Sequence, residues 1–378
     1  MTDTRNWFAP VAPARRRRLP GLSRQGTRIV LDGRTLRNFA ANDYLGLAMH
    51  PALADAARAA LDRGGLGSGA SRLISGDDDA LHQLERELAD WLGFEAALVV
   101  GAGMLANIGL LQALSDRHTH VFADRLNHAS LVDGARLGGG TVHRYRHRDM
   151  DELAALLGRH KAPRRILVSD GVFSMDGDAA DVAALAALAE AHDAVAVVDD
   201  AHGIGTTGPG GKGLVAAAGA AGHPRLILVG TFGKAFGGYG AFILGTRALI
   251  DGLVQRQRTL IYSTALPPPL PAAMRAALDL IRDGGLVARL QANIALFRSL
   301  ATELPLMDSD TAIQPLMVGD DAAALRLSEQ LAAAGYFVPA IRPPTVPAGT
   351  ARLRITLSAA HDEAAIAGLV DALRGALA

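Results

Sequence analysis

Cysteine is absent from the 378 residues of this chain. Without thiols the chain can form no disulfide, no thiol nucleophile and no zinc site of the cysteine type, and we expect no metal site. The formal net charge is zero, because 38 basic residues balance 38 acidic ones. This balance gives no reason to expect a nucleic acid or an anionic membrane as a partner.

Long apolar runs are also missing. No stretch reaches the roughly 20 residues that a membrane helix needs, and the first residues show no apolar signal core. The default expectation is therefore a soluble cytoplasmic protein. With 49% hydrophobic residues over 378 positions, the chain is too large for one small core and suggests roughly two domains.

Lysine is scarce, with three residues (Lys161, Lys212 and Lys234) among the 38 basic ones. Lys234 follows an apolar run, in the segment Val-Gly-Thr-Phe-Gly-Lys-Ala-Phe-Gly-Gly. A buried lysine can lose its proton and attack a carbonyl, whereas arginine cannot. Lys234 is thus a candidate nucleophile, although a loop lysine beside a glycine turn, as Lys212 can be, is the simpler alternative.

Short strand-like runs alternate with helical stretches rich in alanine and leucine. Runs that are apolar throughout and separated by helices predict a mostly parallel sheet covered on both faces. The candidate strands cover residues 97–100, 120–123, 166–169, 195–199, 226–229 and 241–244, and the candidate helices include residues 79–92, 149–157 and 181–192.

The chain changes character at the prolines 267–269. The remaining elements suggest a smaller α/β domain, with helices at 271–281, 322–334 and 362–377 and strands at 313–318 and 352–357. Near the other end, residues 27–31 and 36–39 predict a hairpin that turns at Asp32-Gly33. We therefore expect an N-terminal segment with a hairpin (1–44), a large domain (45–270) and a small C-terminal domain (271–378).

Several polar residues follow the candidate strands directly. Ligands of open α/β sheets gather at the carboxyl ends of the strands, which makes these residues candidates for a site. A strand-terminal aspartate is also often only a turn or cap residue. The segments in question are Gly101 to Met104, Asp170 to Gly177, Asp199 to Gly203 and Thr231 to Lys234.

Two common nucleotide sites are excluded by residue identity. The segment at Gly101 lacks the third glycine of a dinucleotide fingerprint, and the Lys234 segment has Leu228 and Ala235 where a phosphate-binding P-loop has Gly and Ser or Thr. Pyridoxal phosphate suits the pieces better. It needs a lysine for its aldehyde, a carboxylate for its ring nitrogen, and helix-start amides or hydroxyls for its phosphate.

The motifs together resemble the α-oxoamine synthases, a family of pyridoxal-phosphate enzymes with the aspartate-aminotransferase-type fold (fold type I). The likeness runs through nearly the whole chain, and the order of the motifs is far more specific than any one of them. The matching segments are 42–47 (NDYLGL), 67–72 (GSGASR), 127–130 (NHAS), 173–178 (FSMDGD), 199–203 (DDAHG), 231–234 (TFGK), 261–264 (IYST) and 341–347 (IRPPTVP).

The resemblance implies roles at the cofactor. Lys234 would join the aldehyde, Asp199 would pair with the ring nitrogen, and His128 would stack on the ring, unless it merely caps a local turn. The other implied contacts are His202 and Ser174 at the ring oxygen, Gly103, Met104 and Thr231 at the phosphate, and Thr264 at the phosphate of the neighbouring subunit in a homodimer.

The resemblance also implies substrate contacts. Arg354 would bind the amino-acid carboxylate in a bidentate fork, but Arg352 points to the same strand face, so the choice depends on the resemblance. Arg16 matches an arginine near the acyl substrate, with a register that can shift by one residue within the run 15–18, and Asn42 is a weaker candidate there. The loop 203–213 and the segment before Arg15 depart from the family pattern.

The implied reaction is a decarboxylative condensation of L-alanine with a pimeloyl thioester, carried by coenzyme A or by an acyl carrier protein. Related reactions of glycine with succinyl-CoA or acetyl-CoA remain open, since the preference for alanine depends on resemblance alone. Two other classes also remain: a non-catalytic α/β ligand-binding protein, and a nicotinamide-dependent dehydrogenase that lacks the glycine fingerprint.

Overall fold

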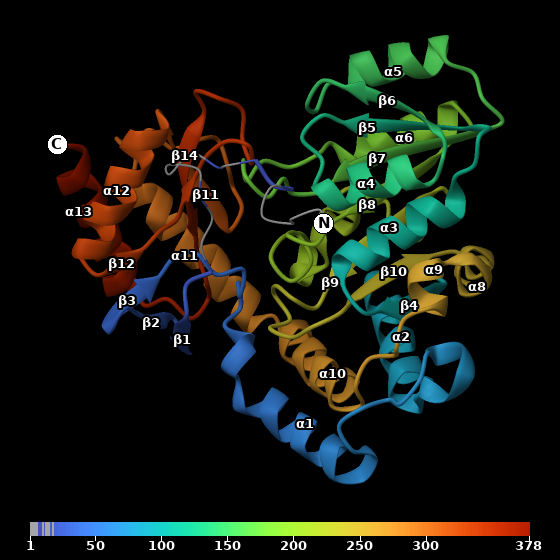
Figure 1. Ribbon diagram of the computed structural model, residues 1–378, viewed down its shortest axis with the longest axis horizontal. Coiled ribbons are helices and arrows are strands. Elements are labelled where there is room, and N and C mark those ends of the chain that lie inside the picture. Colours follow the sequence, from blue (N-terminus) through green and yellow to red (C-terminus); the bar gives the residue numbers. More distant parts are fainter. Residues whose placement is uncertain (1–6, 10, 12–15, 17–18) are drawn as a thin grey trace.

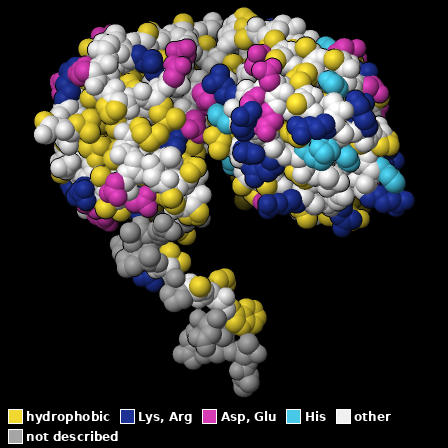
Figure 2. Space-filling view, turned by 90° about the horizontal axis from the view of Figure 1, so that it is seen from above, with side chains coloured by type: hydrophobic (Ala, Val, Ile, Leu, Met, Phe, Trp, Pro, Cys, Tyr) yellow, Lys and Arg dark blue, Asp and Glu magenta, His cyan; other side chains and the backbone are white. Residues whose placement is uncertain are grey.

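The computed structural model describes residues 7–9, 11, 16 and 19–378 of the chain. The described part forms two lobes (Figure 1), and the space-filling view shows the surface hollowed between them (Figure 2). One lobe holds a seven-stranded sheet flanked by helices, and the other holds a three-stranded sheet with helices packed against it. No helix in the described residues is long and apolar enough to cross a bilayer.

The seven-stranded sheet has the order β4-β10-β9-β8-β7-β5-β6. Strands β5 to β9 pair in parallel, while β10 pairs antiparallel with both β4 and β9, so the predicted mostly parallel sheet is confirmed. The strands are β4 (Ala96–Val100), β5 (Thr119–Asp124), β6 (Thr141–Tyr145), β7 (Arg164–Asp170), β8 (Val195–Asp199), β9 (Leu226–Thr231) and β10 (Ala241–Gly245).

Both faces of this sheet are buried, because side chains of each strand alternate between two apolar cores. Val99 and Val198 belong to one core, whereas Leu98 and Val197 belong to the other. The covering helices are α2 (Asp79–Leu92), α3 (Gly103–Leu114), α4 (Ala129–Leu137), α5 (Met150–Arg159), α6 (Val182–Ala191), α7 (Gly213–Ala217), α8 (Arg247–Arg256) and α9 (Arg258–Ile261).

Aspartate side chains start many of these helices. Asp78, Asp149 and Asp181 each accept a hydrogen bond from a backbone N–H of the first turn of α2, α5 and α6, which satisfies one otherwise unpaired donor. Helix α3 is different, because its N-cap is Ala102 and no side chain caps it. Its first amides are therefore left for another acceptor.

The second lobe contains the sheet β11-β14-β13 (Ile313–Gly319, Ala351–Thr356 and Ala340–Ile341). The predicted hairpin is present as β2 (Arg28–Leu31) and β3 (Arg34–Asn38), which extend to β1 (Leu22–Gln25) and to a parallel partner, β12 (Tyr336–Phe337). The helices are α11 (Gly285–Leu300), α12 (Asp321–Ala333) and α13 (Glu363–Leu377).

Some elements go beyond the sequence prediction. Strand β6 lies at the edge of the sheet and has mostly exposed or half-buried residues, so no apolar run marks it. Helix α1 (Pro51–Gly64) buries little besides Leu53 and Ala60 and packs against α10 (Pro269–Arg282) (Figure 1). The domain boundaries at residues 44 and 270 stay a prediction.

Candidate active site

Lys234 lies in the loop after β9, at the carboxyl end of the large sheet. The side chain is half-buried and lines a cavity of about 430 Å³, together with Asn42, Asp43 and His361. Burial lowers the pKa of the Lys234 amine to about 8, although the nearby carboxylates of Asp199 and Asp170 oppose this effect. A usable fraction of the amine is therefore unprotonated near neutral pH.

Asp199 ends the neighbouring strand β8 and is buried. Its Oδ1 accepts a hydrogen bond from the backbone N–H of Ala201 (3.1 Å), and its Oδ2 accepts one from Nδ2 of Asn107 in α3 (2.6 Å). These two donors fix the orientation of the carboxylate. Asp199 thus supplies a negative charge close enough to Lys234 to affect its pKa.

His128 is the N-cap of α4. Its backbone N–H donates to Oδ2 of Asp170 (2.6 Å), and its Nδ1 lies 2.7 Å from the Ser130 hydroxyl. Burial lowers the pKa of the His128 imidazole, while Asp199 opposes this shift. The simpler interpretation, a histidine that caps a local turn, describes these contacts correctly. Asp199 and Lys234 are nevertheless both close enough to affect the pKa of the same imidazole.

A second chain of contacts joins His202 to Arg354. The Tyr44 hydroxyl lies 2.7 Å from Nδ1 of His202 and 3.2 Å from Oδ1 of Asn42. The same Asn42 oxygen accepts two hydrogen bonds from the Arg354 guanidinium, both at 3.2 Å. Burial holds the pKa of His202 well below its usual range, with Lys234 and Arg354 adding to the effect, so this imidazole is neutral.

Arg352 and Arg354 of β14 differ in their partners. Arg352 donates to Oδ1 of Asp176 at 2.6 Å, and both side chains of this ion pair are largely buried. Arg354 instead contacts neutral oxygens, the Ser174 carbonyl and the Asn42 amide. Among the described residues Arg354 makes no ion pair of 4 Å or less with a carboxylate. Of these two arginines, Arg354 is therefore the one whose charge is available to an anionic ligand.

The start of α3 lies beside Thr231. A Cβ placed on Gly103 would stand 3.8 Å from the Thr231 hydroxyl oxygen. This hydroxyl accepts the N–H of Gly233 at 3.2 Å and donates to the Gly240 carbonyl at 3.0 Å. Met104 is 45% exposed at the same helix start. The uncapped amides of α3 and the neighbouring hydroxyl form an arrangement suited to a phosphate.

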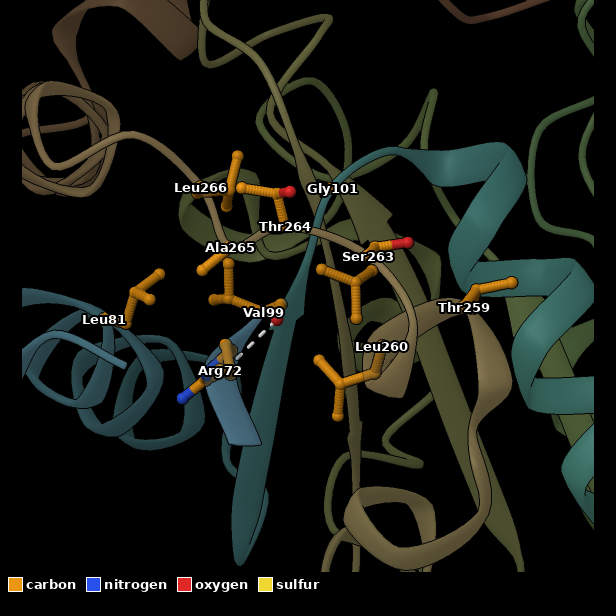
Figure 3. A pocket seen from close by; sticks show the side chains of 11 residues that line it. Arg72, Leu81, Val99, Gly101, Thr259, Leu260, Ser263, Thr264, Ala265 and Leu266 are labelled. Carbon is orange, nitrogen blue, oxygen red and sulfur yellow. Dashed lines mark hydrogen bonds between the residues drawn. The ribbon is translucent and has the colours of Figure 1, made fainter. Parts of the chain in front are cut away.

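Thr264 pairs with Ser71 in an isolated β-bridge. It lines a small cavity with Gly101 at the end of β4, and Arg72 forms the opposite wall, where it donates to the Val99 carbonyl (Figure 3). Thr264 thus lies on the β4 side of the sheet end, near the start of α3. Its predicted contact with the phosphate of a neighbouring subunit stays a prediction.

The structure does not bring Arg16 into the site, because this residue is exposed and is not among the residues that line the Lys234 cavity. The other arginines of the run 15–18 lie outside the described residues. Ser174 contributes its carbonyl oxygen to Arg354 and lines a separate pocket with Asp176 and Arg352. Its hydroxyl contact with a ring oxygen therefore stays a prediction.

Two buried carboxyls next to the site were not assigned roles from the sequence. Asp170 pairs in register with Asp199 on the adjacent strand; burial raises its pKa well above the usual range, and Asp199 adds to the shift. Burial also raises the pKa of Asp200 to about 7. A Cβ on Gly203 would lie 2.0 Å from Oδ1 of Asp200, so the chain must have glycine there to wrap around this carboxyl.

Sequence reasoning also missed Tyr44 and Asn107. Tyr44 stands inside a motif that was recognised as a whole, whereas Asn107 had one weak signal, an amide side chain in the otherwise apolar middle of α3. Asn107 is 1% exposed. A buried amide is costly without partners, and the partners of Asn107 come from β8 and α4, elements distant in sequence.

Comparisons with known proteins show the family of the chain. The family model for aminotransferase class I and II matches residues 34–373. The chain is 49% identical over 358 residues to the 8-amino-7-oxononanoate synthase of Methylococcus capsulatus, covering 94% of this chain and 92% of that protein.

Two solved structures show the same fold. A serine palmitoyltransferase (SPT) structure with PLP has a TM-score of 0.90 and 30% identity, covering 95% of this chain and 91% of that one. An 8-amino-7-oxononanoate synthase from Francisella tularensis has a TM-score of 0.78 and 29% identity, covering 90% and 98%. The predicted fold class is confirmed, and the chain belongs to the aminotransferase class I and II family and, within it, to the 8-amino-7-oxononanoate synthases.

Proposed function

We propose that this protein condenses L-alanine with a pimeloyl thioester and releases 8-amino-7-oxononanoate, carbon dioxide and the free thiol. This is the step that the names of its relatives imply, at about half identity over more than nine tenths of the chain. The observation that carries the proposal is the arrangement around Lys234. Lys234 lines one cavity with Asn42, which Arg354 contacts, and the Asp199 carboxylate lies close enough to affect the pKa of the Lys234 amine.

The residues present fit pyridoxal phosphate. The amine of Lys234 has a lowered pKa, Asp199 offers a carboxylate held by two donors, and the uncapped start of α3 beside Thr231 offers amides and a hydroxyl. An amine, an anion and a phosphate cup are the three requirements of this cofactor. Lys234, Asp199, Gly103, Met104 and Thr231 would hold it.

When bound, pyridoxal phosphate supplies an aldehyde that an amine can join and a ring that accepts electrons from a neighbouring carbon. Asp199 would keep a proton on the ring nitrogen, which would make the ring a better acceptor. The guanidinium of Arg354 binds the alanine carboxylate and orients the Cα–H bond. Lys234, unprotonated because its pKa is low, removes the Cα proton and later returns a proton to the product.

His128 and His202 complete the set as neutral imidazoles. Burial lowers the pKa of both, so each can donate or accept one hydrogen bond without bringing a second positive charge near Arg354 and Lys234. His202, held by Tyr44, would contact the ring oxygen, as Ser174 would, and His128 would lie against the ring face. Asn42 is placed at the cavity beside Arg354 and would contact the acyl substrate there.

The protein would act as a homodimer with Thr264 of one subunit serving the other. Large apolar side chains around the Thr264 segment are solvent-exposed in the single chain, namely Leu66 (75%), Ile74 (80%) and Tyr262 (73%). Ser71, bridged to Thr264, precedes Ile74 in the same turn. Exposed apolar side chains gathered in this way are typical of a surface that another chain covers.

Thiol release distinguishes this reaction from those of related enzymes. The purified protein should release thiol with alanine and pimeloyl-CoA or a pimeloyl carrier protein, and at most slowly with glycine plus succinyl-CoA or acetyl-CoA. The variant Lys234→Ala should lose nearly all turnover, whereas Lys161→Ala, which removes an exposed lysine, should keep it. Ordinary turnover of Lys234→Ala, or a preference for glycine, would overturn the proposal.

A further inference from the structure

A continuous line of buried hydrogen bonds joins Asp199 to His128 through two residues for which the mechanism has no role. Nδ2 of Asn107 donates to Oδ2 of Asp199 (2.6 Å) and to the hydroxyl of Ser130 (2.8 Å). The Ser130 hydroxyl in turn lies 2.7 Å from Nδ1 of His128. Asn107 and Ser130 are each 1% exposed, so water does not compete for these bonds.

The orientation of the Asn107 amide is fixed by its neighbour. A carboxylate accepts hydrogen bonds and cannot donate them, so the amide NH2, and not its oxygen, must face Asp199. The second N–H of the same NH2 group then points to Ser130. Oδ1 of Asn107 is buried without a hydrogen-bond partner among the described residues.

The direction of each following bond is determined in the same way. Because the Ser130 oxygen accepts from Asn107, the single hydroxyl proton of Ser130 is free to be donated to Nδ1 of His128. The backbone N–H of Ser130 also points to this nitrogen, at 3.3 Å. A nitrogen that accepts two donors carries no proton, so the ring proton of His128 resides on Nε2.

Packing brings the three elements close enough for these bonds. A Cβ on Gly134 of α4 would lie 2.8 Å from the backbone oxygen of Asn107 in α3. The glycine therefore allows α4 to approach α3 closely, one turn after Ser130. Asp170 fixes the other side of His128 by accepting its backbone N–H.

We propose that Asn107 is a positioning residue, which connects the Asp199 carboxylate through Ser130 to His128 and locks this imidazole as the tautomer with its proton on Nε2. His128 then presents an N–H donor, not a bare nitrogen, on the edge of the ring remote from Ser130. Such a donor suits a carbonyl or carboxylate oxygen of a reacting acyl or amino-acid group. The inference depends on the proposed function for the location of that group, but not for the tautomer itself.

The isosteric variant Asn107→Asp provides the critical test, because it reverses the direction of the hydrogen bonds from position 107 through Ser130 to His128. The carboxyl oxygen that faces Ser130 accepts in either protonation state, since any proton on the new side chain is drawn toward Asp199. Ser130 must then donate to position 107, and Nδ1 of His128 must donate to Ser130. The prediction is that His128 changes to the Nδ1–H tautomer or becomes protonated near neutral pH.

The measurement is ring-nitrogen NMR of histidine-labelled protein without cofactor, with the His128 signals assigned by their loss in His128→Gln. Wild type should show the Nε2–H tautomer at pH 7. Asn107→Leu, which removes the donors without adding an acceptor, should lose part of the Nε2–H population because the Ser130 hydroxyl can then accept as well as donate, whereas Asn107→Asp should lose it fully.

Cofactor titration adds a second measurement. The affinity of Asn107→Leu for pyridoxal phosphate should fall about tenfold or more, since one hydrogen bond to a charged group is lost. Ser130→Ala keeps the bond from Asn107 to Asp199 and should change this affinity less than threefold.

A wild-type His128 with its proton on Nδ1, or an unchanged tautomer in Asn107→Asp, would overturn the inference. These NMR outcomes are independent of the reaction, because they do not require alanine, a thioester or turnover. Conversely, failure in the thiol-release assay together with the Nε2–H tautomer would contradict the proposed function but support the role of Asn107.

Discussion

Replacing Arg354 by glutamine should weaken the use of alanine far more than the use of a substrate without a carboxylate. In the structure, the Arg354 guanidinium contacts neutral oxygens, with two bonds to Asn42 at 3.2 Å. An amino-acid carboxylate would receive two charge-assisted bonds in their place.

The magnitude follows from those bonds. A hydrogen bond to a charged group contributes about 1.5–3 kcal/mol, and glutamine retains one neutral donor. We therefore expect a loss of about 2–4 kcal/mol, which is about 30- to 1000-fold in kcat/KM. Arg354 is only 6% exposed, so solvent screens its pair with the alanine carboxylate weakly. We therefore expect a loss in the upper part of this range.

The assay is exchange of the Cα hydrogen in D2O, followed by NMR, with alanine and with alaninamide. Arg354→Gln should lower kcat/KM for alanine by the stated factor and for alaninamide by less than about threefold. Arg352→Gln is the matched control, since it breaks the buried ion pair with Asp176 and should lower thermal stability while alanine exchange stays within a few fold. Equal losses for both substrates in Arg354→Gln would show that Arg354 does not bind the alanine carboxylate and acts instead by holding Asn42 and Ser174.

Two further predictions concern stability and assembly. Although burial opposes the shift, hydrogen bonds to Asp124 and Asp178 raise the pKa of His147 from 6.5 to about 9. The protonated His147 therefore adds to the free energy of unfolding by at most on the order of 3 kcal/mol. This contribution is complete below pH 6.5 and is lost as the pH rises through 9. In urea unfolding, the free energy of unfolding of His147→Gln should therefore change much less between pH 6.5 and 9 than that of the wild type. The same pH dependence in both proteins would contradict this prediction. Ile74→Asp, which places a charge on the exposed apolar surface near Thr264, should shift the protein from dimer to monomer in light scattering, and an unchanged dimer would argue against that interface.

The sequence predicted the large sheet well because its strands are apolar throughout and are separated by helices with clear aspartate caps. It also indicated Lys234 and Asp199, since both follow such strands directly. The edge strand β6 escaped prediction because its residues are mostly exposed or half-buried and form no apolar run. Helix α1 escaped because its burial depends on α10, more than 200 residues later in the chain.

The supporting residues of the site were harder to predict for a physical reason. Asn107, Tyr44 and Asp170 act through hydrogen bonds to residues far away in sequence, namely Asp199, His202 and His128. Local spacing contains no information about such pairs. The choice between Arg352 and Arg354 is similar, because both lie on one strand face and are distinguished by distant partners, Asp176 for the first and Asn42 for the second.

Borohydride reduction of the purified protein loaded with pyridoxal phosphate, followed by peptide mass spectrometry, will identify the lysine that holds the cofactor. We expect one stable cofactor adduct on the peptide that contains Lys234, with none on Lys161 or Lys212. An adduct on another lysine, or a reduced protein without any adduct, would contradict the assignment of Lys234 as the residue that holds the cofactor.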